Sequence, residues 1–281
     1  FYSDDMTERA IERLSLEHDL RGAAQRGEIF MVFQPQIELA TRRIIGAEVL
    51  MRWRHPVHGL ISPARFIPIA EDSGLILVIG EWILSEACRQ VRLWRDRGIL
   101  DLCLSVNVSA VQFRQGDFIR VVERALNESG IPPDSLELEL TESVVMQGVE
   151  SSLQKLREVE ALGVRVAIDD FGTGHSSLSY LRQFTIDRLK IDQSFVRDLP
   201  GNVDAEAIAA AIVAMGLSLG LRIIAEGVET EAQAKFLQSV LCREGQGYLY
   251  ARPMVADEFE AWVATWEQHA KNDHVNVQSR G

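Results

Sequence analysis

Carboxylates, amides and one lysine stand at or next to the ends of successive apolar segments of this sequence. They are Glu48, Asn107, Glu139, Asp169, Asp170, Lys190, Glu226, Glu229 and Gln246. A single glutamate in such a place usually caps a helix or faces solvent. This explanation is less convincing when one apolar segment after another carries a polar residue at its end. Several carboxylates gathered at one place repel one another, so some must be protonated unless a cation neutralises them. The set therefore predicts a metal site.

The donor atoms indicate the kind of metal. They are carboxylate and amide oxygens without cysteine or histidine, and such donors suit Mg²⁺, Mn²⁺ or Ca²⁺ rather than zinc or copper. The carboxylates are numerous enough for two ions, and a two-metal site activates a water and stabilises both the attacking and leaving oxygens of a phosphoryl displacement. Lys190 adds a positive charge beside them, which would face a phosphate or the nucleophilic water.

Two further stretches carry weaker patterns. The segment DDFGTGHSSL (Asp169 to Leu178) has two glycines before a helix, which fits a tight turn capped by Ser176 as well as a functional loop. It contains no complete phosphate-binding motif. His55 and His58 lie in the polar stretch RHPVHGL, where a surface turn is expected.

The elements that must hold these residues begin with two strands, Ile29 to Pro35 and Ile44 to Met51. About eight residues separate the strands, whereas a parallel crossover needs a dozen or more, so the pair is predicted to be antiparallel. A helical pattern over Met6 to Gly27 precedes them.

After these two strands, helices and strands alternate. The predicted helices are Leu75 to Arg97, Asp117 to Ser129, Val149 to Leu162, Ser176 to Arg182, Ala205 to Leu219, Glu229 to Leu241 and Glu258 to Gln268. The predicted strands are Leu102 to Val108, Leu136 to Leu140, Val164 to Asp169, Arg188 to Ile191, Arg222 to Ala225 and one near Tyr248 to Tyr250. The alternation predicts an α/β fold, a modified TIM (β/α)₈ barrel with an antiparallel first strand, whose rim gathers the polar residues. A doubly wound open sheet is the alternative.

The composition excludes several classes of protein. The 281 residues carry 29 Lys+Arg and 41 Asp+Glu, a formal net charge of −12, which argues against binding along a nucleic-acid polymer or on an anionic membrane. The longest uncharged apolar run, Ala207 to Leu221, is too short to span a membrane. Cys88, Cys103 and Cys242 lack CxxC spacing and are expected to be reduced thiols of a cytoplasmic protein.

Eight short motifs follow one another along the chain. They are FQPQ (Phe33 to Gln36), AEVLMRW (Ala47 to Trp53), NVSA (Asn107 to Ala110), ELTES (Glu139 to Ser143), DDFGTGHSSL, LKID (Leu189 to Asp192), AEGVET (Ala225 to Thr230) and QGYLYARP (Gln246 to Pro253). In this order they resemble the motifs of the EAL-domain cyclic di-GMP phosphodiesterases. The resemblance covers about residues 18 to 262 and implies the same modified TIM barrel.

The resemblance also implies a role for each matching position. The implied metal ligands are Glu48, Asn107, Glu139 and Asp169 for one ion, Asp169 and Asp170 for a second, and Glu229 and Gln246 in the shell of metal and water. The implied pair beside the hydrolytic water is Lys190 and Glu226, and which of them is the base stays open. The implied substrate contacts are Gln34, Leu50 and Arg52, of which Arg52 meets a phosphate. Glu142 matches the residue that supports the loop after the fifth strand, and in the family that loop couples the metals to a homodimer interface.

Three positions depart from the family pattern. Val49 replaces an alanine of the signature, His175 a tyrosine of the loop and Arg243 a common aspartate. None of them replaces a ligand, so they bear on the loop and on dimer coupling rather than on the chemistry.

The expected organisation is a linker helix or the tail of a preceding domain at residues 1–17, the EAL domain at 18–262 and a C-terminal tail at 263–281. The opening FYSDDM resembles the end of a GGDEF domain. The chain is therefore expected to be a fragment of a longer sensory protein with upstream GGDEF and sensory domains. The domain itself is expected in the cytoplasm, whether or not the longer protein has a membrane anchor.

The sequence thus predicts a phosphodiesterase dependent on Mg²⁺ or Mn²⁺, with two ions per site, that opens cyclic di-GMP to linear pGpG. The resemblance places it in bacterial second-messenger signalling that regulates biofilm and motility. One alternative is a catalytically silent cyclic di-GMP receptor that signals through a partner, although such members usually lack a metal ligand and none is missing here. Another, resting on the barrel and its acidic rim alone, is an enolase-like Mg²⁺ lyase.

Overall fold

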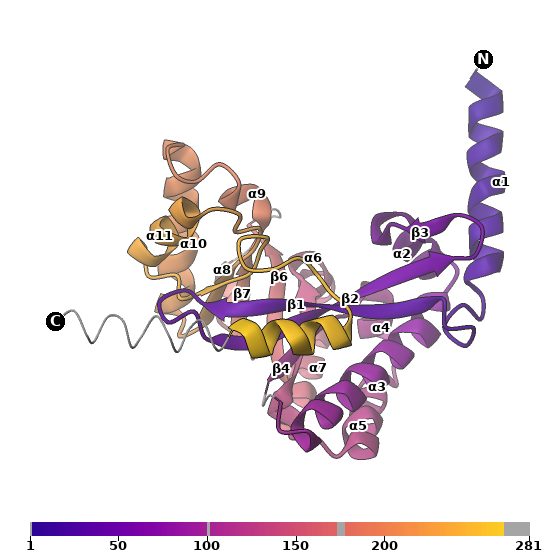
Figure 1. Cartoon of the computed structure of the whole chain (residues 1–281), viewed down its shortest axis with the longest axis horizontal. Coiled ribbons are helices and arrows are strands. Elements are labelled where there is room, and N and C mark those ends of the chain that lie inside the picture. The colour runs from indigo at the N-terminus through magenta and orange to yellow at the C-terminus, as the bar shows by residue number, and fades with distance from the viewer. Residues whose placement is uncertain (1, 100–101, 173–177, 267–281) are drawn as a thin grey trace.

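Apolar segments that alternate with helices close into a ring of eight strands in the computed structural model, which describes residues 2–99, 102–172 and 178–266 (Figure 1). In order around the ring, the strands are β1 (Ile29–Glu38), β2 (Ile44–His55), β4 (Cys103–Asn107), β5 (Leu136–Thr141), β6 (Arg165–Phe171), β7 (Arg188–Ile191), β8 (Arg222–Ala225) and β9 (Glu244–Gly245). The ring is complete because β1 pairs with both β2 and β9. The short β3 (Gly59–Ile61) pairs with the end of β2, outside the ring.

The strand directions confirm the predicted barrel. β1 is antiparallel to both of its neighbours, and the other neighbouring pairs around the ring are parallel. The closed ring excludes the open doubly wound sheet. It also places the carboxyl ends of the parallel strands at one rim of the barrel, where active sites of such folds lie.

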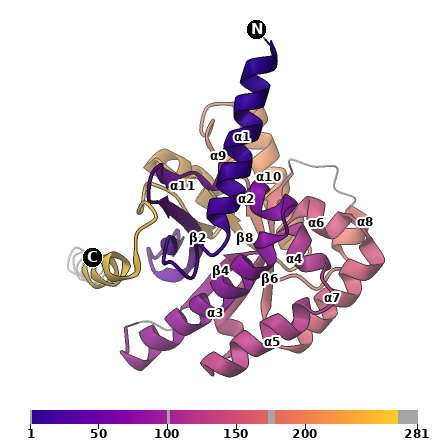
Figure 2. The same ribbon diagram turned by 90° about the vertical axis from the view of Figure 1, so that its right-hand side faces the viewer.

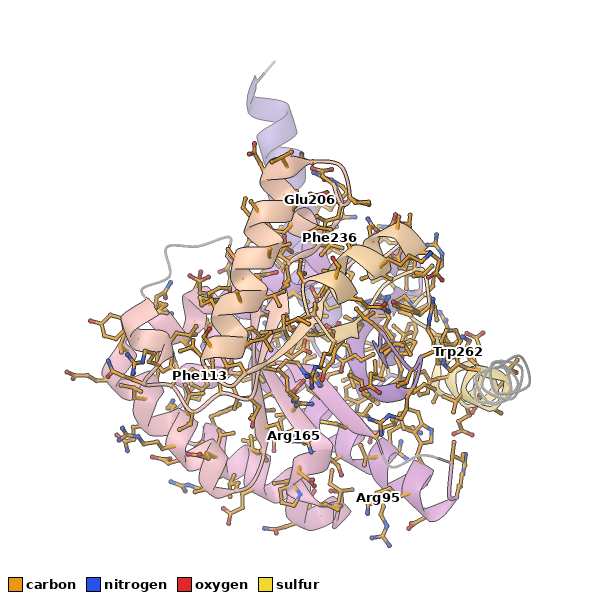
Figure 3. All side chains as sticks on the ribbon, turned by 90° about the vertical axis from the view of Figure 1, so that its left-hand side faces the viewer. Arg95, Phe113, Arg165, Glu206, Phe236 and Trp262 are labelled. Carbon is orange, nitrogen blue, oxygen red and sulfur yellow. The ribbon has the colours of Figure 1, made fainter. Side chains whose placement is uncertain are left out.

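Helices cover the outside of the ring (Figures 1 and 2). The longer ones are α2 (Pro63–Asp72), α3 (Leu75–Asp96), α5 (Phe118–Ser129), α7 (Val149–Ala161), α10 (Val203–Ser218) and α11 (Glu231–Ser239). The shorter ones are α4 (Ala110–Arg114), η1 (Pro133–Ser135), α6 (Glu142–Met146), α8 (Leu178–Leu181) and α9 (Gln193–Val196). In Figure 3, Arg165 at the start of β6 and Glu206 near the start of α10 lie toward opposite ends of the molecule. This separation follows the strand directions, because α10 begins on the side where β7 ends.

A helix over residues 256–266 packs beside β1. Its Phe259 lies 6.0 Å from Phe33 of β1 and 5.1 Å from Trp94 of α3, measured between ring centroids. The Trp94 indole also donates a 2.9 Å hydrogen bond to Glu260. This aromatic cluster fixes the end of the described chain to the first strand.

The first helix, α1 (Tyr2–Leu20), extends away from the barrel, and only its carboxyl end packs against it (Figures 1 and 2). Leu16 and Leu20 are buried in the common core, and Arg13 pairs with Asp72 of α2. The expected domain boundary after residue 17 falls inside this helix and stays a prediction.

The structure corrects the predicted last strand. Tyr248 to Tyr250 form a turn, whereas the last strand of the ring is β9, four residues earlier. Gln246 therefore follows the last strand instead of preceding it, as Glu226 follows β8. The predicted helix Ser176 to Arg182 begins outside the described residues, and its described part is α8.

His55 is also placed differently from the prediction. It is the last residue of β2 and only 5% exposed, not part of a surface turn. Its Nδ1 accepts hydrogen bonds from the backbone N–H groups of Val57 and His58 at 3.1 Å, and its Nε2 lies 3.3 Å from the Asp19 carboxylate of α1. This histidine therefore connects the β2–β3 turn with the first helix.

Cys88, Cys103 and Cys242 are buried free thiols. Within the described ranges, no helix combines the length and the apolar composition needed to cross a membrane.

Candidate active site

Two layers of polar side chains fill the inside of the barrel, where most barrels of this kind are apolar. The upper polar layer, at the carboxyl-terminal rim, consists of Gln34, Glu48, Asn107, Glu139, Asp169, Lys190, Glu226 and Gln246. The lower polar layer consists of Gln36, Ser105, Glu137, Arg188, Arg222 and Glu244. The two layers lie two residues apart on β4, β5 and β7, because alternate side chains of a strand face the same side.

Lys190 is the centre of the upper polar layer. Its ammonium lies 2.6 Å from Glu139, 2.7 Å from Glu226, 3.2 Å from Asp169 and 3.8 Å from Glu48. The lysine is 1% exposed. Four carboxylates thus face one ammonium, and three negative charges are left over when all of them are ionised.

The pKa values reflect this excess. Burial raises the pKa of Glu139 well above its ordinary value, and neighbouring carboxylates oppose the lowering effect of Lys190. Burial likewise raises the pKa of Glu226 to about 8. The carboxylates in turn raise the pKa of Lys190 well above its ordinary value despite its burial. A second cation would relieve this site electrostatically.

The lower polar layer has no such excess. Arg188 lies 2.7 Å from Glu137 and 3.1 Å from Glu244, and Arg222 lies 3.2 Å from Glu137. Two guanidinium groups therefore balance two carboxylates. Gln36 adds a neutral acceptor, its Oε1 lying 2.9 Å from the Arg188 guanidinium.

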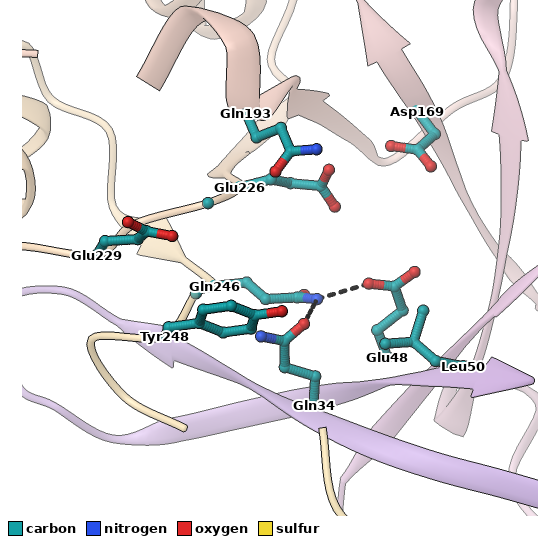
Figure 4. Close-up of a pocket in the computed structure, with 11 residues that line it drawn as sticks. Gln34, Glu48, Leu50, Asp169, Gln193, Glu226, Glu229, Gln246 and Tyr248 are labelled. Atoms are coloured by element: carbon teal, nitrogen blue, oxygen red, sulfur yellow. Dashed lines mark hydrogen bonds between the residues drawn. The ribbon is translucent and has the colours of Figure 1, made fainter. Parts of the chain in front are cut away.

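Amide groups hold Glu48 from two sides. Asn107 Nδ2 donates to Glu48 Oε1 at 2.7 Å, and Gln246 Nε2 donates to Glu48 Oε2 at 2.5 Å. The same Gln246 nitrogen also donates to Gln34 Oε1 at 3.0 Å (Figure 4). These contacts fix the carboxylate of Glu48, which is the sequence-predicted metal ligand on β2.

Two cavities open at this rim, and both have Glu48 and Leu50 in their walls. The smaller, of about 270 Å³, is lined by Gln34, Glu48, Leu50, Asp169, Gln193, Glu226, Gly227, Glu229, Gln246, Gly247 and Tyr248. The larger, of about 370 Å³, is mostly apolar and extends from Glu48 and Asn107 over Arg52 to Ile67 and Glu71 of α2. The site therefore has room for a ligand with two bulky ends and a charged centre.

The remaining predicted residues also lie at this rim. Asp170 follows Asp169 on β6 in a left-handed conformation (φ 53°), which is rare for a residue other than glycine and often marks a functional site. Its pKa is raised by burial and then by Asp169. Glu142 accepts a 3.2 Å hydrogen bond from the N–H of Gly172, just after β6. His175 and the rest of the predicted dimer loop lie outside the described residues.

Sequence reasoning missed Gln193, Tyr248 and Glu71 as cavity-lining residues. Tyr248 lies inside a quoted motif but was expected in a strand. Gln193 directly follows the LKID motif, and this neighbourhood is the one indication that could have found it. Glu71 belongs to α2, a helix that was not predicted.

Within the described residues, no three His, Cys, Asp or Glu side chains are arranged to hold a metal ion. The reason is visible in the distances, because the Lys190 ammonium occupies the point on which the carboxylates converge. The donor set nevertheless fits a hard cation. Glu139 Oε1 is buried without a hydrogen-bond partner, and the carboxylates outnumber the cations around them.

Comparisons with known proteins agree on one family. The profile of the EAL domain matches residues 17–253. The bifunctional diguanylate cyclase/cyclic di-GMP phosphodiesterase MucR of Pseudomonas aeruginosa is 47% identical over 264 residues, which are 94% of this chain and 38% of that protein. The oxygen sensor protein DosP of Escherichia coli is 40% identical over 265 residues, 94% of this chain and 33% of that protein. The chain thus spans about a third to two fifths of the length of these curated relatives.

Solved structures show the same likeness. The PaMucR phosphodiesterase in complex with c-di-GMP superimposes with a TM-score of 0.84 at 47% identity, covering 87% of this chain and 99% of that chain. The EAL enzyme Bd1971 with bound cAMP and cyclic di-GMP gives a TM-score of 0.86 at 34% identity, covering 91% and 70%. The chain therefore belongs to the EAL-domain family of cyclic di-GMP phosphodiesterases.

Proposed function

We propose that this chain hydrolyses cyclic di-GMP to linear pGpG with the help of two divalent cations, Mg²⁺ or Mn²⁺. The observation that carries the proposal is the contrast between the two polar layers. The lower polar layer balances its own charges, whereas the upper one holds four carboxylates around one ammonium. A barrel that can neutralise one layer with arginines leaves the next layer negative, and this arrangement suits a cation-binding site.

The residues that would hold the cations are Glu48, Asn107, Glu139, Asp169 and Asp170, with Glu229 and Gln246 in the surrounding shell. Bound divalent cations would lower the pKa of the attacking water and stabilise the charge on the phosphate. Lys190 and Glu226, 2.7 Å apart, would hold the water and take up its proton. Which of the two is the base stays open.

The cavities support a dinucleotide substrate. A cyclic dinucleotide has two purines joined through phosphates, and the two cavities meet at Glu48 and Leu50. Arg52 lines the larger cavity and offers a cation for a phosphate. We propose that one guanine enters each cavity and that the scissile phosphate lies above Glu48. The solved complex of PaMucR with c-di-GMP, at 47% identity, supports this substrate class.

We also propose how the chain assembles, which domain precedes it in a longer protein, and where that protein acts. We propose that the chain forms a homodimer through the loop after β6, because Glu142 anchors the start of that loop at Gly172. The name of the relative MucR, a diguanylate cyclase as well as a phosphodiesterase, supports an upstream GGDEF domain. A cytoplasmic location and a role in biofilm or motility control agree with such a protein.

The test is hydrolysis of cyclic di-GMP, followed by chromatography of the nucleotides with Mg²⁺, Mn²⁺ or Ca²⁺. Glu48→Ala and Asp169→Ala are expected to abolish pGpG formation, because each removes a predicted metal ligand. Ca²⁺ is expected to inhibit, since it does not keep the tight octahedral geometry of Mg²⁺. Glu86→Ala, which changes a carboxylate of α3 outside the site, serves as the control and should retain activity.

Near wild-type hydrolysis by either site variant would show that the metal assignment is wrong. Tight binding of cyclic di-GMP by the wild type without any pGpG in Mg²⁺ or Mn²⁺ would instead favour the silent receptor.

A further inference from the structure

The Arg188 guanidinium crosses the inside of the barrel beneath the candidate active site. Its Nη1 donates to Glu137 Oε1 on β5 at 2.7 Å and to Gln36 Oε1 on β1 at 2.9 Å, and its Nε lies 3.1 Å from the Glu244 carboxylate on β9. Arg188 is 1% exposed and Glu137 is 0% exposed. One buried side chain of β7 thus contacts three other strands of the ring, none of which is a neighbour of β7.

The bond from Arg188 to Glu137 has a counterpart in the site. Two residues further along the same strands, the Lys190 ammonium of β7 lies 2.6 Å from Glu139 of β5, because alternate residues of a strand face the same side. β6 lies between β5 and β7 in the ring, and its residue opposite Arg188 is Ala167. The small side chain of this alanine leaves room for the arginine to reach β5.

The backbone pairing between β6 and β7 is interrupted at the level of the site. It is regular at Arg188 and Leu189, then its register shifts, and the next paired residue of β7 is Ile191. Lys190 therefore has no register partner on β6. Asp170, on the β6 side of this interruption, has a left-handed backbone (φ 53°). The side-chain bonds of Arg188 start from the last regular part of this pairing, directly below the site.

The contact between Lys190 and Glu139 is a poor means of fixing the distance between their strands. Glu139 is a proposed metal ligand, so its carboxylate has to serve a cation as well as the lysine. Neither Glu137 nor Gln36 is a proposed ligand, and the bonds of Arg188 to them can stay the same whether or not a cation is bound.

We propose that Arg188 is a positioning residue for hydrolysis. It ties β7 to β5 and β1 one layer beneath the site, and it thereby sets the distance between Lys190 and Glu139. The arginine acts through these two residues and contacts neither substrate nor cation itself. This inference rests on the proposed phosphodiesterase function. A residue needed for stability alone would leave the turnover and the metal affinity of the folded protein unchanged, whereas a positioning residue changes both.

The experiment begins with Arg188→Met, which removes the bonds between the strands. At a temperature where circular dichroism shows the protein folded, kcat and KM are measured with cyclic di-GMP, and Mn²⁺ binding is measured by calorimetry without nucleotide. We expect kcat to fall by about 10- to 100-fold with KM nearly unchanged, since a displacement of about 1 Å caused far from the chemistry can cost about 100-fold. Mn²⁺ binding should weaken by about 10-fold, the lower end of the range for residues that orient metal ligands.

A second variant separates positioning from stability. Arg188→Met with Glu137→Gln removes one positive and one negative group together and leaves Arg222 and Glu244 to balance each other. Its urea midpoint should return most of the way to that of the wild type, because loss of both members of a buried pair costs much less than loss of one. Its kcat and Mn²⁺ affinity should stay as low as in Arg188→Met, since the bond between β5 and β7 is not restored.

The matched control is Arg165→Met. Arg165 is a strand arginine too, at the start of β6, but its guanidinium lies 3.3 Å from Asp134 of η1 and ties no second strand of the ring. This variant should change neither kcat nor Mn²⁺ binding.

Recovery of kcat and Mn²⁺ affinity together with stability in the double variant would overturn the proposal, and so would an Arg188→Met protein with wild-type kcat and Mn²⁺ binding. A wild type that fails to hydrolyse cyclic di-GMP would refute the proposed function instead. In that case a crystal structure of the double variant decides about Arg188. A longer distance between Lys190 and Glu139 than the present 2.6 Å supports the positioning role, and an unchanged distance contradicts it.

Discussion

Lys190 holds the point toward which the carboxylates of the upper polar layer turn. It is fully enclosed, and its ammonium contacts Glu139, Asp169 and Glu226 within 3.2 Å. In the absence of a bound cation, the lysine itself plays the part of one. Any divalent ion that enters must share these carboxylates with Lys190, so ion and lysine together set the charge of the site.

Lys190→Met tests this role. In EDTA the variant is expected to lose about 3–5 kcal/mol of unfolding free energy, because removal of one partner leaves buried charges unpaired. Saturating Mg²⁺ should recover part of the loss, since the cation binds the carboxylates of the folded state only. Urea unfolding followed by circular dichroism, with and without Mg²⁺, measures both values. Lys235→Met, at an exposed position of α11, is the control.

An equal loss in EDTA and in Mg²⁺ would show that the lysine supports packing and does not substitute for a cation.

The strands bring these residues together through close approaches that leave no space for larger side chains. Gly46 of β2 lies two residues before Glu48, and a Cβ at this position would be 2.7 Å from the Cys103 carbonyl oxygen and 3.0 Å from Gln36 Oε1. The glycine therefore makes room for Gln36 in the lower polar layer.

Gly46→Ala is expected to cost about 1–3 kcal/mol of unfolding free energy, because overpacking forces β2 and β4 apart. Turnover should fall as well, since the shift displaces Glu48. Gly116→Ala is the matched control, because a Cβ added at Gly116 would meet nothing within 4 Å and the backbone there is unstrained. It should be neutral or stabilise by up to about 1 kcal/mol. Guanidinium unfolding and the hydrolysis assay would refute the argument if the two variants behaved alike.

Sequence patterns predicted every strand of the ring except β9, because short apolar segments alternate regularly with helical ones along the chain. The short connection between Gln36 and Arg43 was enough to predict an antiparallel first pair, and β1 and β2 form that pair. β9 was misplaced because it has only two residues, while the nearby tyrosines favour a strand intrinsically. The burial of His55 could not be read locally, since it depends on Asp19 of the distant α1.

In the candidate site, too, some features could be predicted from local patterns and others depend on distant contacts. The alternation of strands and helices along the chain and the rim rule for barrels were sufficient to predict that the polar set would converge. The lower polar layer was not predicted, because Arg188 and Glu137 look like ordinary strand-end charges until the ring places β5 and β7 on facing positions. The bond of Gln34 to Ala251 depends on residues 217 positions apart, which no local pattern contains.

Part of the negative charge of the molecule is concentrated at one place, the mouth of the barrel. The formal net charge of −12 argues against a polyanionic partner bound along the surface, but four of the carboxylates lie inside the barrel mouth around the single ammonium of Lys190. Cations held there would invert the local potential and attract a phosphate. The same buried carboxylates make the stability of the molecule depend on pH and on divalent ions.

The direction of that pH dependence follows from the raised pKa of Glu226, about 8 in the folded chain against an ordinary value of 4.5. Between these values the folded state binds more protons than the unfolded state, so the unfolding free energy falls as pH rises. Glu139, with its pKa also raised by burial, acts in the same direction. The stabilising proton is fully present below the ordinary pKa and is lost as the pH passes the folded one.

We therefore expect the melting temperature in EDTA to decrease from about pH 5 to about pH 8, and the decrease to be smaller in saturating Mg²⁺. A bound cation keeps the carboxylates ionised, so folding no longer takes up protons at the site. Differential scanning calorimetry across this range measures both curves. Glu226→Gln removes the titrating group without removing its volume and should flatten the EDTA curve while leaving the other carboxylates in place. A melting temperature that rises with pH in EDTA, or a slope that Glu226→Gln does not change, would show that the upper polar layer is already neutralised without a metal ion.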